Sequence, residues 1–210
     1  AYGEAFRAPT INDLYYEAPF YHGNPDLKPE RSKRYDLIAD WTTEKSSFTV
    51  DLYHSLIKDG IQTTPDWSTV KNIGSIKITG LNLKLEREFA TNLNGRLSYS
   101  WLSKTELDKN TNKYTPNTPY GAHRANFTVN YKCNSLTTAL NWQMVSDRTA
   151  LPGRTTLPNY QLFQLDLGYR FNDRLNLNLT AHNLLDEEYE IEDGYPLPGR
   201  SFSAALRYSF

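Results

Sequence analysis

The chain ends in Phe202-Ser203-Ala204-Ala205-Leu206-Arg207-Tyr208-Ser209-Phe210, where apolar side chains occupy every second position. Successive side chains of a β-strand point to opposite faces, so a period of two is typical of a strand and not of a helix. Ser, Arg and a small Ala fill the positions between. The stretch therefore predicts a β-strand with one apolar face and one polar face.

The same alternation recurs along almost the whole chain. It is clear in Phe163–Phe171 and Leu175–Ala181, whereas Tyr53 and His54 break it. Together these patterns predict ten strands, near residues 1–7, 31–42, 47–63, 70–90, 93–106, 121–132, 135–148, 159–171, 174–185 and 199–210.

The expected connections alternate in length. Short turns near 43–46, 90–92, 133–134 and 172–173 separate long polar loops near 8–30, 64–69, 107–120, 149–158 and 186–198. Outer-membrane barrels have short periplasmic turns and longer external loops, and strands of about 11 residues tilted by about 45° cross their apolar band. We therefore expect an all-β fold: an antiparallel transmembrane β-barrel, with loop 8–30 on the external side.

Composition removes several other classes of protein. The 210 residues carry a net charge of -1, whereas nucleic-acid binders usually show a basic excess. No apolar run approaches the about 20 residues of a membrane-spanning helix. With Cys133 as the single cysteine and no Cys/His metal spacing, neither an internal disulfide nor a zinc site is expected. The 13% of aromatic residues gather near the predicted strand ends, as barrel girdles do.

Three segments carry motifs that resemble a known family. They are Phe6-Arg7-Ala8-Pro9 with Gly23-Asn24-Pro25-Asp26-Leu27-Lys28-Pro29-Glu30, then Asn72-Ile73-Gly74-Ser75-Ile76-Lys77-Ile78-Thr79-Gly80-Leu81-Asn82, and finally Asn183-Leu184-Leu185-Asp186-Glu187-Glu188-Tyr189 with Pro198-Gly199-Arg200. These segments are similar to those of TonB-dependent outer-membrane receptors, and most like those of cobalamin receptors. Asn82 stands where that family usually has Glu.

The resemblance implies more than the strand pattern does. Residues 1–210 would form the C-terminal portion of a barrel of about 22 strands, whose plug domain and first strands lie outside this chain. We interpret the chain, which begins at Ala1 without a Met, as a piece of that longer protein. Its expected place is the Gram-negative outer membrane, among lipids, with a TonB complex acting through the plug to drive uptake of cobalamin or a ferric siderophore.

Aromatic residues on the long loops are the candidates for ligand binding, because exposed rings are unfavourable in water unless they pack or bind something. The set comprises Tyr15, Tyr16, Phe20, Tyr21, His22, Tyr114 and Tyr195. Asp186–Asp193 is acidic, but its spacing matches no EF-hand loop, so no metal and no cofactor is expected. Arg200 is expected to form a structural ion pair, and Phe210 to be read by the barrel-assembly machinery as an edge-strand signal.

Three alternatives remain open. The same alternation would serve a passive porin or a small closed ten-stranded barrel. A barrel enzyme, such as an outer-membrane lipase or protease, would need a site assembled from distant strands, because no hydrolase or metalloprotease motif is present. A soluble all-β binding module would bury the apolar rows between two stacked sheets. No catalytic residue is expected.

Overall fold

A computed structural model of the chain describes residues 1–64, 66–108, 113–150 and 155–210. Ten antiparallel strands follow one another across a single large sheet, and an eleventh, β10 (Lys113–Pro116), pairs only with the end of β9. In spatial order the ten are β1 (Tyr2–Arg7), β4 (Glu30–Thr42), β5 (Ser46–Lys58), β8 (Ser75–Ala90), β9 (Leu93–Asp108), β11 (His123–Cys133), β12 (Leu136–Ser146), β13 (Tyr160–Arg170), β14 (Leu175–His182) and β17 (Ser201–Tyr208).

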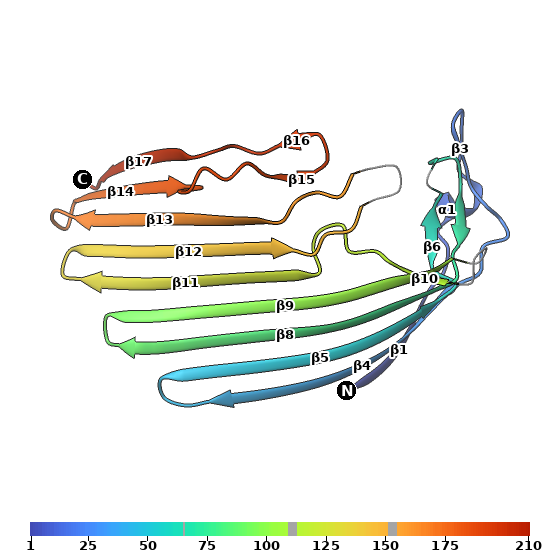
Figure 1. Cartoon of the computed structure of the whole chain (residues 1–210), viewed down its shortest axis with the longest axis horizontal. Helices are drawn as coiled ribbons and strands as arrows, with labels where there is room; N and C mark the ends of the chain where they lie inside the picture. Colours follow the sequence, from blue (N-terminus) through green and yellow to red (C-terminus); the bar gives the residue numbers. More distant parts are fainter. Residues whose placement is uncertain (65, 109–112, 151–154) are drawn as a thin grey trace.

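The curved sheet forms one layer (Figure 1), so the apolar rows are not buried between two stacked sheets. The predicted ten-strand meander is confirmed. The predicted strands 47–63 and 70–90 differ most from the observed β5 and β8 and are longer than both. Strand β5 ends at Lys58, directly before Asp59, which adopts a positive φ of 53°. Residues 61–63 and 70–72 then form β6 (Ile61–Thr63) and β7 (Val70–Asn72), a separate hairpin beyond the main sheet.

The alternation of connection lengths is also confirmed. Four tight turns lie at one end of the sheet and the long connections lie at the other (Figure 1). The long connections contain α1 (Ile11–Tyr15), β2 (Glu17–Ala18), β3 (Tyr21–His22), β15 (Glu190–Glu192) and β16 (Tyr195–Pro196). Of the expected loops 107–120 and 149–158, residues 109–112 and 151–154 lie outside the described residues.

The strand register keeps the apolar side chains on one face across the whole sheet. Going from β4 to β13, one row of directly paired positions consists of Trp41, Phe48, Leu85, Leu97, Phe127, Trp142 and Phe163. Most of these side chains are half-buried or exposed, and no described side chain lies below 2% relative exposure. This face is therefore an apolar surface that covers no protein core, as expected for a face that meets lipid.

The opposite face is a hydrogen-bonded polar surface. Thr128 Oγ1 donates to Asn141 Oδ1 at 2.9 Å, and Asn141 Nδ2 donates to Asp166 Oδ2 at 3.1 Å. Thr180 Oγ1 donates to the other oxygen of Asp166 at 2.8 Å, so this chain of contacts crosses β11 to β14. On β9, Arg96 pairs with Glu86 of β8 at 2.6 Å. Such a face suits a watered or protein-filled lumen.

The register also explains why Tyr53 and His54 break the sequence alternation. Tyr53 lies on the polar face, where its ring covers Gly80 of β8 and the Arg34 guanidinium lies 4.5 Å from the ring centroid. His54 lies on the apolar face and forms a 2.9 Å hydrogen bond with Thr79 Oγ1 through Nδ1. Each irregular residue is thus satisfied by a partner on the neighbouring strand.

The two faces predict opposite responses to a new charge. Leu83 lies in the middle of β8 on the apolar face, between Val50 and Tyr99, whereas Asn82 lies on the polar face and donates to Asp51 at 3.1 Å. Leu83→Arg should lower the free energy of unfolding by about 2–4 kcal/mol in lipid vesicles, because a charge at bilayer depth is desolvated. Denaturant titration of the full-length protein measures this.

Asn82→Arg is the matched control, since the new guanidinium would meet the Asp51 carboxylate instead of lipid. It should change stability by less than about 1 kcal/mol, the usual size of an exposed ion-pair effect. Equal losses from both variants would contradict the assignment of the faces.

Candidate functional site: the long connections

The long connections build their own small core beyond the end of the sheet. Leu27, Ile61 and Val70 are buried against one another, and Leu14 and Tyr21 pack around them. These residues come from the β1–β4 connection and from the β6–β7 hairpin, which lie side by side in Figure 1. We call this unit, residues 8–29 with 59–64 and 66–74, the N-terminal loop unit.

Hydrogen bonds join its two segments. The His22 main-chain N–H donates to the Ser68 carbonyl at 2.8 Å, and Asn24 Nδ2 donates to the Val70 carbonyl at 3.0 Å. Lys28 N–H donates to Asn72 Oδ1 at 2.8 Å. Because both segments depend on the same bonds, the unit presents a defined surface and not two independent loops.

Helix α1 begins with a capping box, which explains why this short turn is ordered. The Thr10 hydroxyl accepts from the Asp13 main-chain N–H at 3.1 Å, and the Asp13 carboxylate accepts from the Thr10 N–H at 2.9 Å. Gly23 then passes against the helix, and its N–H donates to the Tyr16 carbonyl at 2.7 Å. The helix therefore sets where Tyr15 and Tyr16 lie.

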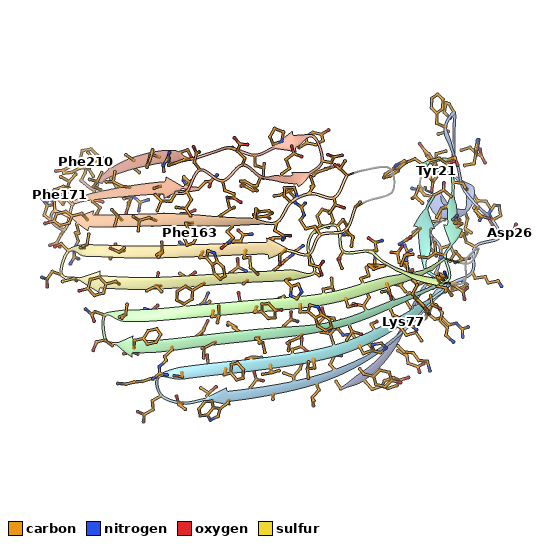
Figure 2. All side chains as sticks on the ribbon, in the orientation of Figure 1. Tyr21, Asp26, Lys77, Phe163, Phe171 and Phe210 are labelled. Atoms are coloured by element: carbon orange, nitrogen blue, oxygen red, sulfur yellow. The ribbon has the colours of Figure 1, made fainter. Side chains whose placement is uncertain are left out.

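The five aromatic candidates of this loop come together in the unit, but they differ in availability. Phe20 is 88% exposed at the tip of the β2–β3 hairpin, and Tyr15 and Tyr16 are also exposed. Tyr21 packs on the small core and its ring lies 5.9 Å from that of Tyr16. His22 pairs with Glu17 through Nδ1. Figure 2 shows Tyr21 and Asp26 beyond the end of the sheet.

The other two candidates lie on different connections. Tyr114 belongs to β10, and the Lys77 ammonium lies 3.9 Å from its ring centroid. Tyr195 is exposed on β16, in the connection between β14 and β17. The predicted set thus spans three connections, and only the first five residues form one cluster.

Trp67 is a surface aromatic residue that the candidate set lacked. It is 76% exposed at the tip of the β6–β7 hairpin and has a positive φ of 61°. A bulky residue in this region is strained, and strain of this kind is concentrated at functional sites. Beside it, hydrogen bonds from Thr64 and Ser68 lower the pKa of Asp66 to about 2. A large aromatic residue within the predicted polar loop 64–69 is the sequence feature that could have identified Trp67.

The acidic segment of the β14–β17 connection has structural partners. Asp186 Oδ1 accepts from the Arg200 main-chain N–H at 2.7 Å, and its other oxygen lies 3.7 Å from the Arg200 guanidinium, so the expected ion pair is confirmed. Glu190 Oε2 accepts from the Gly194 N–H at 3.0 Å. Within the described ranges, no group of three or more His, Cys, Asp or Glu could hold a metal ion.

Comparison with known proteins defines the class. The family described as "TonB dependent receptor-like, beta-barrel" matches residues 1–184. The chain belongs to this family of outer-membrane β-barrel receptors, as its motifs, its meander and its two-faced sheet indicated. In the described part, no helix is long and apolar enough to span a membrane.

Two similar curated proteins are vitamin B12 transporters. Those named BtuB from Photobacterium profundum and Vibrio vulnificus are each 29% identical to this chain over 99% of its length. The chain spans about a third of the length of each, 34%.

Solved structures confirm the fold. The copper transporter OprC superimposes with a TM-score of 0.76 at 19% identity, covering 100% of this chain and 36% of its own. The siderophore receptor PirA from Acinetobacter baumannii gives a TM-score of 0.72 at 18% identity, covering 100% and 38%.

Gly23 should be required for the arrangement of the aromatic cluster. A Cβ at this position would lie 2.7 Å from the main-chain atoms of Leu14 and Tyr15, so Gly23→Ala must displace α1. We expect a loss of about 1–3 kcal/mol of local stability and faster amide exchange at Leu14 and Asn24, measured by hydrogen–deuterium exchange of the full-length protein.

The control is Gly3→Ala in β1, where an added Cβ would meet nothing within 4 Å. Exchange at the two amides should stay unchanged in this variant. If Gly23→Ala also leaves it unchanged, the close approach of Gly23 to α1 does not order the cluster.

Proposed function

We propose that the protein to which this chain belongs is a receptor that takes up cobalamin across the outer membrane at the expense of energy. The observation that carries the proposal is the alignment of two vitamin B12 transporters with 99% of this chain. The external aromatic rings would capture the ligand, and the polar face of the sheet would line the path that follows. Uptake is then binding followed by gated movement, without covalent chemistry.

The surface rings support capture of a large, partly apolar ligand. The N-terminal loop unit exposes the rings of Phe20, Tyr15 and Trp67. The residues that pack against its small core are Leu14 and Tyr21, so these three rings are not used to bury it. Aromatic side chains supply large contact areas and dominate binding energy at many interfaces. The motif residues Gly23 and Asn24 hold this surface through bonds to α1 and β7.

A ferric siderophore is the second candidate, because siderophore receptors are among the structures that share the fold. The charge of the external connections favours cobalamin. Acidic residues outnumber basic ones in the sequence of these connections. The acidic ones are Asp13, Glu17, Asp26, Asp59, Asp66, Asp147, Asp186, Glu187, Glu188, Glu190, Glu192 and Asp193, and the basic ones are Lys28, Lys71, Lys109, Lys113, Arg148, Arg154 and Arg200. A negative surface lowers the local concentration of anionic ligands such as ferric catecholates and does not repel a neutral one.

We further propose that residues 1–210 form the C-terminal portion of a larger barrel. Within the described part, β1 pairs only with β4 and β17 only with β14, so the ten-strand sheet does not close on itself. Open sheet edges are unfavourable in a bilayer, because their main-chain groups find no water. Additional strands would complete the wall, which argues against a small closed barrel, and a plug in the lumen would distinguish the receptor from a passive porin.

Two partners follow from this assignment. A TonB complex would act through the plug, and the barrel-assembly machinery would engage the C-terminal strand. Phe210 is fully exposed and its ring lies 5.2 Å from that of Tyr208 in an edge-to-face contact. Together with the apolar face of β17, this aromatic pair would offer the machinery an edge strand for pairing.

The experiment is a binding titration of the full-length receptor with cyanocobalamin. Phe20→Ala should raise the Kd about tenfold or more, because a well-exposed ring at a binding surface contributes roughly 1–2 kcal/mol. Because Phe20 is 88% exposed, the substitution leaves the fold intact. Isothermal calorimetry or equilibrium dialysis in detergent measures the change.

Phe89→Ala is the matched control, since Phe89 is an exposed ring at the short-turn end of β8. It should leave the Kd unchanged. If the receptor binds ferric enterobactin but not cyanocobalamin, a ferric siderophore replaces cobalamin as the proposed ligand. Binding of neither probe would remove both.

A further inference from the structure

Arg148 is a buried cation that touches three separate external connections. It lies two residues beyond β12 and is 6% exposed. Its Nε donates to the Pro119 carbonyl at 3.2 Å, in the connection before β11. One terminal nitrogen donates to the Pro158 carbonyl at 3.4 Å and to the Glu190 carbonyl at 2.7 Å, and the other donates to Ile191 at 2.7 Å.

The chemistry of these contacts requires arginine. Burial of a charge is unfavourable unless hydrogen bonds replace its hydration. Here the partners are main-chain carbonyls that approach from different directions, which matches the planar fork of a guanidinium and not the point charge of an ammonium. The guanidinium carbon also lies 5.9 Å from the Tyr160 ring centroid, a weak cation–π contact.

Other contacts extend the same unit. The rings of Tyr160 and Tyr189 lie 4.9 Å apart, which links the first residue of β13 to the β14–β17 connection. Burial, followed by the nearby Tyr160, raises the pKa of the Tyr189 phenol. Thr118 N–H donates to Thr149 Oγ1 at 2.7 Å, and Thr149 N–H donates back to the Thr118 carbonyl at 3.2 Å.

We propose that Arg148 is a positioning residue that holds the described parts of the β10–β11, β12–β13 and β14–β17 connections as one unit, and that this order sets the affinity for the ligand. The inference rests on the proposed function, because the unit includes Tyr195, one of the candidate ligand-binding residues, and the acidic segment Asp186–Asp193. A surface ordered before binding loses less conformational entropy when the ligand arrives. Without Arg148, the ligand itself would have to order the three connections.

The variants are Arg148→Met, which keeps an unbranched stem but removes the guanidinium with every donor, and Arg148→Lys, which keeps the charge and removes the fork. Arg124→Met is the matched control, because Arg124 of β11 donates twice, at 3.3 and 3.0 Å, to the carbonyl of Tyr120 in the adjoining β10–β11 connection. All are made in the full-length receptor, and heat-modifiable migration on gels checks that the barrel has folded.

The first measurement is hydrogen–deuterium exchange in peptides that cover 117–122, 155–159 and 189–192. Arg148→Met should accelerate exchange in all three peptides, and Arg148→Lys should restore protection only in part. Arg124→Met should affect 117–122 alone. Acceleration confined to one connection, or full protection with Lys, would overturn the proposal.

The second measurement is the Kd for cyanocobalamin, which should rise about tenfold in Arg148→Met and stay unchanged in Arg124→Met. Looser connections with an unchanged Kd would overturn the role in affinity. If the unsubstituted receptor does not bind cyanocobalamin, the proposed ligand is wrong, and the exchange experiment still decides whether Arg148 holds the three connections together.

Discussion

The pairing of every main-chain group along an antiparallel ladder is the constraint on which this structure depends. In a bilayer no water replaces a missing backbone hydrogen bond, so each strand must keep two neighbours over the depth that it crosses. Since side chains alternate along a strand, a shift of one residue would move every apolar group to the polar face. The apolar row from Trp41 to Phe163 and the polar hydrogen-bond network around Asp166 both follow from this register.

The long connections beyond the end of the sheet are free of that constraint and are organised by burial of side chains. Leu27, Ile61 and Val70 form a small apolar core on one side, whereas a buried cation, Arg148, joins the connections on the other. The first arrangement excludes water, and the second replaces hydration with carbonyl groups. Both leave rings such as Phe20 and Tyr195 exposed, which is the property that a ligand-capturing surface needs.

Several details of the site could not be predicted from the sequence. Tyr21 and Phe20 are neighbours of similar type, yet one packs on the core and the other extends into solvent, because the β2–β3 hairpin turns between them. Arg148 is one of 23 basic residues, and nothing in the sequence around it distinguishes it from the others. Its partners are main-chain carbonyls of connections that lie far apart along the chain. Main-chain acceptors leave no trace in the sequence, so no pattern of side chains indicates them.

The sequence was sufficient to predict the strands of the main sheet, the order of long and short connections and the two faces. The alternation of apolar and polar residues and the turn residues act over only a few positions, so they can be read from short segments. The family motifs likewise lie within short segments. Contacts between distant residues decided which aromatic rings are free and how three connections share one guanidinium. Such contacts depend on which strands become neighbours, and only the folded sheet brings those residues together.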